Sequence, residues 1–365
     1  MNFYIGLFVA TFICAFADFF NLAKRYKICI NIFLSIIYIL LSGLRWNGLD
    51  WKVYYSFFTL NNTLNNFLYG EMAVDKGFGV LNFLIKTAVD DYSVLLFVVA
   101  IITISIKVEF INKFAVFPLF SMLYWFSTNI GEIFFIRQFL AVSITLIAFR
   151  FIVKKQFIPF CFFVYLAATI QISTIFFLPA YFLFYKKIKV KFIFLGLVVS
   201  IILGKILDPT ILPSLSGVIN VLPIDVDRIN NKIDLYSDYG MADREEGTLL
   251  LGYLRRLLFL PLELWAINKM DKFNINYRGF VNIISFGYIL YFALSGLGLT
   301  FASRINTTYI VYEMLTIPAL FLLIKTWYMR MLVFILLSGY MFFKYIYFVQ
   351  QQAEEYIPYV NILFQ

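Results

Sequence analysis

The 365-residue sequence is too apolar for a water-soluble domain. Hydrophobic residues make up 62% of it, aromatic residues 21% and charged residues only 14%, whereas soluble domains carry about 25% charged residues. The chain contains no histidine, which removes the commonest general base and the commonest metal ligand. The composition therefore predicts an all-α polytopic membrane protein whose chemistry rests on Arg, Lys, Asp, Glu or Tyr side chains.

Apolar runs that can cross a bilayer, which requires about 20 residues, recur along the whole sequence. They begin near Phe3, Ile28, Val94, Ala115, Ile133, Phe157, Ile172, Phe192, Thr248, Phe280, Tyr309 and Leu332. We therefore predict about twelve transmembrane helices in a single domain that covers residues 1–365. The apolar piece from Phe78 to Val89 is too short to span and is expected to be re-entrant or interfacial.

The net charge of +9 comes from short basic clusters, and these predict the orientation. A basic cluster follows every odd-numbered run, and basic residues mark cytoplasmic loops. The clusters are Lys24, Arg25 and Lys27; Lys107 and Lys113; Arg150, Lys154 and Lys155; Lys186, Lys187, Lys189 and Lys191; Lys269, Lys272 and Arg278; and Lys325 and Arg330. Both termini are then expected on the outer side of the membrane.

A long outer loop is expected at about 205–247, between the eighth and ninth runs. A loop of this length in a compact bundle is more often functional than idle, and it carries Tyr236, Tyr239 and Arg244. The acidic residues around Arg244 are better explained as a solvated loop than as a metal site, and no metal or cofactor is expected.

Five arginines approach the outer side of the predicted bundle. They are Arg45, Arg137, Arg255, Arg256 and Arg304. Guanidinium groups form bidentate hydrogen bonds to phosphate oxygens, so such a set suits an anionic lipid headgroup, especially a pyrophosphate. Alternatively, each arginine extends to the interface or pairs with a carboxylate such as Asp50, Glu132 or Glu263.

Asp50 is flanked by the aromatic residues Trp46, Trp51, Tyr54 and Tyr55. These rings could stack on the apolar face of a sugar while the carboxylate accepts hydrogen bonds from its hydroxyls. An interfacial aromatic belt with a paired acid is an equally good explanation.

The segment Leu-Ser-Gly-Leu-Arg45-Trp-Asn-Gly48-Leu-Asp50-Trp51-Lys-Val-Tyr54 resembles a signature of the EpsG-like family of Wzy-type polysaccharide polymerases. Further segments resemble family motifs in the expected order. They are Lys76-Gly77-Phe78 with Leu81-Asn82, Arg137-Gln138-Phe-Leu-Ala141, Ala168-Thr-Ile-Gln171-Ile-Ser173, Tyr236 with Tyr239, and Arg304 with Tyr309. Gln171 stands where the family usually has histidine, which favours a positioning role there over base catalysis.

The resemblance implies a glycosyltransferase-C-like helical bundle in the bacterial inner membrane, with its active site facing the periplasm. Such enzymes polymerise oligosaccharide repeat units in O-antigen or exopolysaccharide synthesis. They transfer the growing chain from undecaprenyl pyrophosphate to the non-reducing end of a new unit. No metal is implied. The expected partners are lipid-linked oligosaccharides and a chain-length regulator, with no nucleic acid.

Within that reaction, we expect Arg137 and Arg304, with Arg45 or Arg255 and Arg256, to stabilise the leaving pyrophosphate. Asp50 is the first candidate to orient or deprotonate the acceptor hydroxyl, and Glu132 is the second. The remaining substrate-binding candidates are Trp51, Gln138, Gln171, Tyr236, Tyr239 and Arg244.

Two other functions remain open from the sequence. An O-antigen ligase, or another transferase that uses a polyprenyl-linked sugar, would share the fold and the arginines. A flippase for the lipid-linked oligosaccharide would instead need polar residues along a path through the whole bundle.

Overall fold

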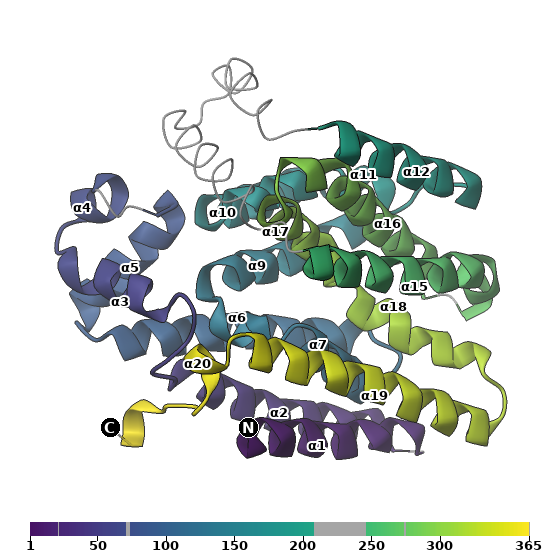
Figure 1. The fold of residues 1–365 in the computed structure, drawn as a ribbon, viewed down its shortest axis with the longest axis horizontal. Helices are drawn as coiled ribbons and strands as arrows, with labels where there is room; N and C mark the ends of the chain where they lie inside the picture. Colours follow the sequence, from purple (N-terminus) through teal and green to yellow (C-terminus); the bar gives the residue numbers. More distant parts are fainter. Residues whose placement is uncertain (21, 71–73, 208–245, 274, 365) are drawn as a thin grey trace. The chain divides into compact units, whose positions relative to one another are not determined.

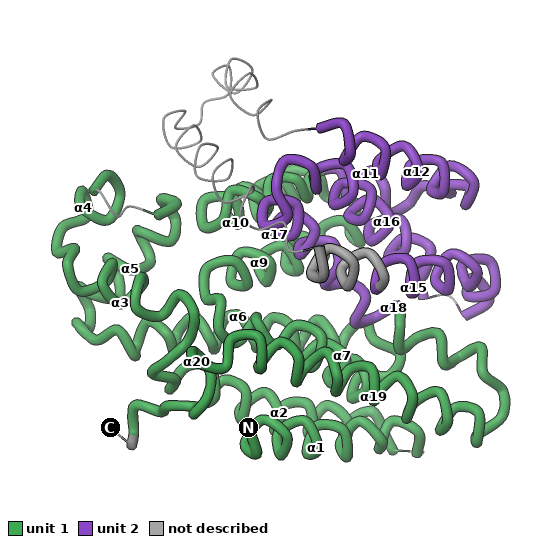
Figure 2. The backbone as a smooth tube through the Cα atoms, viewed as in Figure 1, with its two compact units in different colours: residues 1–178, 317–365 green, residues 179–316 purple. Residues whose placement is uncertain are grey.

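The computed structural model describes residues 1–20, 22–70, 74–207, 246–273 and 275–364, and within this part the chain is helical (Figure 1). Most of the predicted long outer loop lies outside the described residues, together with Tyr236, Tyr239 and Arg244. The chain divides into two compact units, residues 1–178 with 317–365 and residues 179–316 (Figure 2). The prediction of a single domain therefore stays a prediction.

Unit 1 contains both ends of the described chain. Its α-helices are α1 (Asn2–Phe16), α2 (Lys24–Gly43), α3 (Trp51–Leu60), α4 (Leu64–Tyr69), α5 (Lys76–Ala88), α6 (Tyr92–Phe114), α7 (Pro118–Thr128), α8 (Gly131–Phe134), α9 (Ile136–Val153), α10 (Phe157–Ile170), α19 (Trp327–Gln351) and α20 (Ala353–Tyr356). Short 3-10 helices are η1 (Ala17–Phe19), η2 (Ile172–Phe177), η6 (Leu320–Leu323) and η7 (Ile362–Phe364).

Unit 2 is the middle part of the sequence. Its helices are α11 (Ala180–Leu183), α12 (Val190–Ile206), α15 (Glu246–Met270), η4 (Asp271–Phe273), α16 (Tyr277–Leu294), η5 (Ser295–Leu297), α17 (Leu299–Ile310) and α18 (Glu313–Ala319), the last of which runs on into unit 1.

The described part has six helices that are long and apolar enough to cross a membrane, and seven if a bent pair counts as one span. The six are Asn2–Phe19, Lys24–Gly43, Tyr92–Phe114, Ile136–Val153, Tyr277–Leu297 and Trp327–Gln351. The bent pair, Leu299–Ile310 and Glu313–Leu323, has an angle of 56°. An all-helical, polytopic membrane architecture is thus confirmed, whereas the count of about twelve spans stays a prediction.

Two lysines that we predicted in a cytoplasmic loop lie inside a helix instead. Helix α6 continues through Lys107 and Lys113 to Phe114, because the buried Lys107 ammonium forms an ion pair with Glu132. A paired charge can be buried in a helix at much lower cost than an unpaired one. Lys107 therefore gives no information on the position of a loop.

The two ends of the unit 1 chain are held together by tyrosine hydrogen bonds. The Tyr4 hydroxyl donates to the Tyr356 carbonyl at 2.9 Å, and the Tyr345 hydroxyl donates to the Tyr4 carbonyl at 3.1 Å. The start of α1 and the end of α19 therefore lie at the same end of unit 1, as the ribbon also shows (Figure 1).

Helix α7 begins at a carboxylate cap from elsewhere in the sequence. The Asp18 carboxylate accepts hydrogen bonds from the backbone N–H groups of Leu119 and Phe120 at 2.7 and 2.9 Å, and Lys27 lies 3.0 Å from it. An acidic side chain at a helix N-terminus satisfies free N–H groups and interacts favourably with the helix dipole. This cap ties the turn between α1 and α2 to α7.

Close packing of α2 on α6 requires glycine at position 43. A Cβ atom there would lie 2.9 Å from the Phe97 Cα atom and 2.5 Å from its ring. We therefore expect Gly43→Ala to destabilise the protein by about 1–3 kcal/mol, measured as a lower midpoint of thermal unfolding in detergent. Gly6→Ala on α1 is the matched control, since its Cβ would meet nothing within 4 Å. Equal midpoints for the two variants would contradict this packing.

Candidate functional site

One hydrophobic cluster in unit 1 brings together the motif segments that are far apart in sequence. Its buried members come from α3, α5, α6, α9 and α10: Tyr54, Phe58, Phe78, Tyr92, Leu95, Leu96, Val99, Ile136, Leu140, Ala141, Ile144, Ala167 and Ile170. Trp46 and Trp51 pack against it. The segments that resemble family motifs, from the first at Arg45 to the fourth at Gln171, are thus supported by a single core.

The loop between α2 and α3, which carries the first motif, is organised by a buried arginine. Arg45 is 2% exposed, and its guanidinium donates to the Phe134 carbonyl at 2.7 Å and to the Asn47 carbonyl at 3.2 Å. Gly48 has φ +135°, and a Cβ atom there would lie 2.5 Å from Arg45 Nη1. The arginine and glycine of this motif therefore have a common structural explanation.

The C-terminal segment, residues 356–362, pairs with the same loop. The Trp46 N–H donates to the Val360 carbonyl at 2.8 Å, and the Ile362 N–H donates to the Leu44 carbonyl at 3.0 Å. The Asn47 amide adds a bond to the Pro358 carbonyl at 2.9 Å. Burial raises the pKa of Tyr359 to about 12, so its phenol stays neutral. We had not predicted this pairing, because nothing in the sequence links segments so far apart.

Of the two predicted catalytic carboxylates, Asp50 is the one that is not engaged by another side chain in the described part of the chain. It lies half-buried directly before α3, and its carboxylate forms no hydrogen bond or ion pair with the residues that the structure describes. Beside it, the Trp51 ring stacks on Tyr55 with centroids 4.9 Å apart, and Trp46 packs against Trp51 at 4.6 Å. The Asp50 carboxylate, a hydrogen-bond acceptor, thus lies next to a group of aromatic rings.

Two buried hydrogen-bond donors in this aromatic group lack a protein partner in the described part. They are Trp51 Nε1 and the Tyr92 hydroxyl, and the two rings are in edge contact with centroids 5.7 Å apart. A buried polar group without a partner is costly and calls for an explanation, such as a bound molecule.

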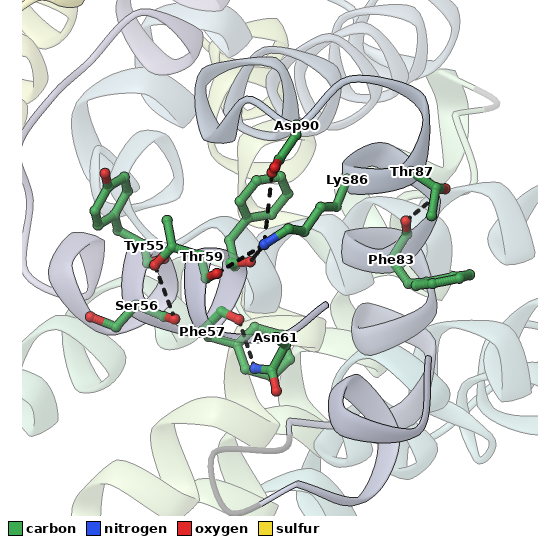
Figure 3. Close-up of polar contacts among 10 residues, drawn as sticks. Tyr55, Ser56, Phe57, Thr59, Asn61, Phe83, Lys86, Thr87 and Asp90 are labelled. Atoms are coloured by element: carbon green, nitrogen blue, oxygen red, sulfur yellow. Dashed lines mark hydrogen bonds and ion pairs between the residues drawn. The ribbon is translucent and has the colours of Figure 1, made fainter. Parts of the chain in front are cut away.

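The far end of α3 is fixed by a lysine from α5. Lys86 Nζ donates to the carbonyls of Phe58 and Thr59 at 2.8 and 2.9 Å, and Asp90 lies 3.7 Å from it (Figure 3). A cation at a helix C-terminus satisfies free carbonyls and interacts favourably with the dipole. Helix α3, which follows Asp50 directly, is therefore fixed at its C-terminal end.

Arg137 lies in the first turn of α9, where the helix dipole also favours an anion. Its guanidinium is 3.8 Å from the Asp75 carboxylate, and these side chains are 15% and 12% exposed. The guanidinium also lies over the Tyr54 ring, 6.0 Å from its centroid. We did not predict Asp75 as a site residue, although it directly precedes the Lys76-Gly77 motif.

The starts of α5 and η2 meet at the end of α10. A Cβ atom on Gly77 would lie 2.3 Å from Thr169 Oγ1, so only glycine fits there. Gln171 is buried where α10 ends, and two residues later the buried Ser173 hydroxyl has no partner among the described residues. Gln138 lies half-buried beside Arg137 on α9.

Glu132, the second predicted catalytic acid, is engaged in a buried network. It forms an ion pair with Lys107 and accepts a hydrogen bond from Trp125 Nε1 at 2.6 Å. Burial raises the pKa of Glu132, and Lys107 opposes this effect. Through these two contacts, Glu132 fixes the turn between α7 and α9. The same turn contains Phe134, whose carbonyl accepts a hydrogen bond from Arg45.

The predicted unit 2 arginines belong to a separate polar network. Arg255 forms an ion pair with the buried Glu313 at 2.5 Å, and Glu313 also accepts a hydrogen bond from the Tyr288 hydroxyl. Glu263, which we considered as a partner for the arginines, instead accepts from the Thr316 hydroxyl.

Arg256 is also buried, and its guanidinium lies over the Tyr291 ring at 3.4 Å from the centroid. With the Asn306 amide in its better-bonded orientation, the amide oxygen accepts from Arg256 at 2.8 Å. Arg304 lies half-buried on α17, two residues before Asn306.

The predicted site residues thus fall into three groups. Unit 1 contains Arg45, Asp50, Trp51, Glu132, Arg137, Gln138 and Gln171, and unit 2 contains Arg255, Arg256 and Arg304. Tyr236, Tyr239 and Arg244 lie outside the described residues. Within the described ranges, no group of three His, Cys, Asp or Glu side chains is placed to hold a metal ion.

An all-helical fold, several apolar helices of membrane-spanning length and motif segments gathered on one core define a polytopic membrane protein with a polar site. The chain belongs to the EpsG family, whose family model matches residues 27–361. The resemblance inferred from the sequence is thereby confirmed, and the family indicates a membrane protein of the polysaccharide-polymerase type. No curated protein and no solved structure matches the chain.

The buried Lys107–Glu132 pair predicts a strongly non-additive mutant series. Lys107→Met or Glu132→Gln alone leaves an uncompensated buried charge and should lower the free energy of unfolding by about 3–5 kcal/mol. The double variant should have a free energy of unfolding much closer to that of the wild type. Thermal unfolding in detergent measures all three. If the double variant lost the sum of the two single effects, the pair would not be coupled as described.

Proposed function

We propose that this protein polymerises lipid-linked oligosaccharide repeat units at the periplasmic face of a bacterial inner membrane. The growing chain would leave undecaprenyl pyrophosphate and join the non-reducing end of a new unit. The observation that carries the proposal is the match to the EpsG family over residues 27–361. The convergence of four motif segments on one core supports it.

The proposed topology has about twelve spans in a glycosyltransferase-C-like bundle, with both termini outside. It is supported by the basic clusters other than that of Lys107 and Lys113, which lie inside α6. The hydrogen bonds between Tyr4, Tyr345 and Tyr356 also support it, because they require the start of α1 and the end of α19 to share one face of the membrane.

In the reaction, the acceptor hydroxyl oxygen attacks the anomeric carbon of the growing chain. The bond from that carbon to the pyrophosphate oxygen breaks, and the acceptor proton must be taken up. We propose Asp50 as the group that orients this hydroxyl and accepts its proton, with the aromatic faces of Trp51 and Tyr55 beneath the sugar. Trp51 Nε1 and the Tyr92 hydroxyl, which have no hydrogen-bond partner among the described residues, are suitable donors to sugar oxygens.

We propose that Arg137 stabilises the pyrophosphate as its negative charge grows, because fixed donors aimed at developing charge lower the barrier most. Gln138 and Gln171 would contact the phosphate or the sugar, together with the Ser173 hydroxyl, which has no hydrogen-bond partner in the part of the chain that the structure describes. We also keep the roles expected from the sequence for the remaining residues. These are pyrophosphate binding by Arg255, Arg256 and Arg304, and substrate binding by Tyr236, Tyr239 and Arg244. Arg45 and Glu132 are proposed to position the loop that carries Asp50.

Deleting the gene in its own strain should collapse the polysaccharide ladder to core plus a single repeat unit on a gel. Complementation with Arg137→Ala should restore little polymer, since removal of one such donor typically costs about 100- to 1,000-fold in rate. Arg25→Ala is the matched control, because Arg25 is exposed at the start of α2. If deletion removed every repeat unit from the core, ligation or export would be the lost step.

Asp50→Asn keeps the shape of the side chain but removes its charge and basicity. We expect it to lower polymer formation about 100-fold or more while the protein level in the membrane stays unchanged. Asp90→Asn, at an exposed carboxylate near the end of α5, should give a normal ladder. Full polymer length from Asp50→Asn would rule out the proposed role.

A further inference from the structure

An apolar groove runs along unit 1 between α1, α2 and the C-terminal segment. Its volume is about 550 Å³, and its walls include Phe3 and Leu7 from α1, and Leu40 and Leu41 from α2. This volume lies within the roughly 300–1,000 Å³ range of small-molecule sites. The groove is therefore large enough for part of a hydrocarbon chain.

The groove opens on a surface that consists of exposed apolar side chains. On α2, Phe33 and Ile36 are 63% and 50% exposed, and the helix period places them on the same side as the groove-lining Leu40. On α1, the groove-lining Phe3 is 49% exposed. Both helices are membrane spans by length and composition, so this surface faces lipid hydrocarbon. A groove that opens into hydrocarbon is filled by a hydrocarbon chain rather than by water or a polar partner.

One end of the groove is built by the segment that pairs with the Asp50 loop. Tyr359 stacks on Phe3 with centroids 5.0 Å apart, and its hydroxyl donates to the Leu41 carbonyl at 2.8 Å. The next two residues, Val360 and Asn361, also line the groove and pair with Trp46 and Arg45. The apolar groove is thus continuous with the loop that carries the proposed acceptor-binding carboxylate.

We propose that this groove binds the polyprenyl tail of the lipid-linked substrate, an inference that rests on the proposed function. The tail lies between α1 and α2 in the outer part of the membrane, and its pyrophosphate end emerges beside Trp46 and Asn361. The groove recognises the part of the tail that it holds by shape, because its walls offer van der Waals contacts and few polar groups.

Photo-crosslinking tests the groove without requiring polymer formation. Full-length protein in nanodiscs is irradiated with a polyprenyl pyrophosphate that carries a diazirine in its tail, and labelled peptides are mapped by mass spectrometry. We expect label at residues 3–7 and 37–41, competed by unlabelled polyprenyl pyrophosphate. A diazirine phospholipid that labels these positions equally, with no competition by polyprenyl pyrophosphate, would show ordinary boundary lipid and overturn the proposal.

Leu40→Trp fills the groove and should reduce this labelling about tenfold, because the displaced tail loses its buried apolar contacts. Ile36→Trp is the matched control, since Ile36 is an exposed residue one turn earlier on the same helix that does not line the groove. Both variants are compared with wild type by size-exclusion chromatography before labelling. Equal labelling of the two variants would also overturn the proposal.

Polymerisation by the same preparations separates the two proposals. If the groove is correct, Leu40→Trp should raise KM for the lipid-linked donor by about tenfold and Ile36→Trp should not. A wild-type protein that forms polymer but shows no competed label refutes the groove alone. A protein that is labelled as expected but transfers no sugar refutes the proposed function, and with it the assignment of the tail as substrate.

Discussion

Much of unit 1 depends on the buried guanidinium of Arg45. A charge that is taken out of water must be surrounded by hydrogen-bond acceptors, or the fold pays several kcal/mol for it. Here the acceptors are the carbonyls of Phe134 and Asn47, so the arginine can be buried only if the turn between α7 and α9 and the loop before α3 lie together. The bridge between Arg45 and Asn361 adds the C-terminal segment to the same point.

The other buried charges obey the same constraint. Lys107 pairs with Glu132, Asp18 with Lys27 and Arg255 with Glu313. The Lys107–Glu132 and Arg255–Glu313 pairs join helices that are not consecutive in sequence, and Asp18 does so through its hydrogen bonds to the start of α7. Each of these contacts selects one arrangement among the many that apolar side chains alone would allow in a bundle this rich in Phe, Ile and Leu. In a membrane, where the hydrophobic effect does not drive helices together, such polar contacts help to select one packing.

The class of fold and the family could be predicted from the sequence because both depend on local signals. Apolar runs, basic clusters and the segment from Gly43 to Tyr54 can all be recognised without tertiary information.

The partners of charged residues could not be predicted in this way. The sequence made Arg45 a candidate for the pyrophosphate and Glu132 a candidate for the acceptor hydroxyl, yet their surroundings engage them in holding a loop and a turn. The Asp50 carboxylate, in contrast, forms no hydrogen bond or ion pair within the described part of the chain. Periodicity does not distinguish these situations, because the partners that engage Arg45 and Glu132 come from elements distant in sequence. A carboxylate inside an apolar run, such as Glu313, nevertheless indicates that a basic or hydroxyl side chain is buried beside it, here Arg255 and Tyr288.

The pairing of the Asp50 loop with the C-terminal segment has a consequence for biosynthesis. During translation, residue 45 leaves the ribosome 316 residues before residue 361, the other member of the bridge. At about 5–20 residues per second, the loop therefore waits for tens of seconds in the membrane before its hydrogen-bond partners exist. The guanidinium of Arg45 must meanwhile rely on the carbonyls of residues 47 and 134, which are made earlier. A nascent chain that stops between the end of α19 and residue 358 would contain most of the helices and still lack the segment that pairs with this loop.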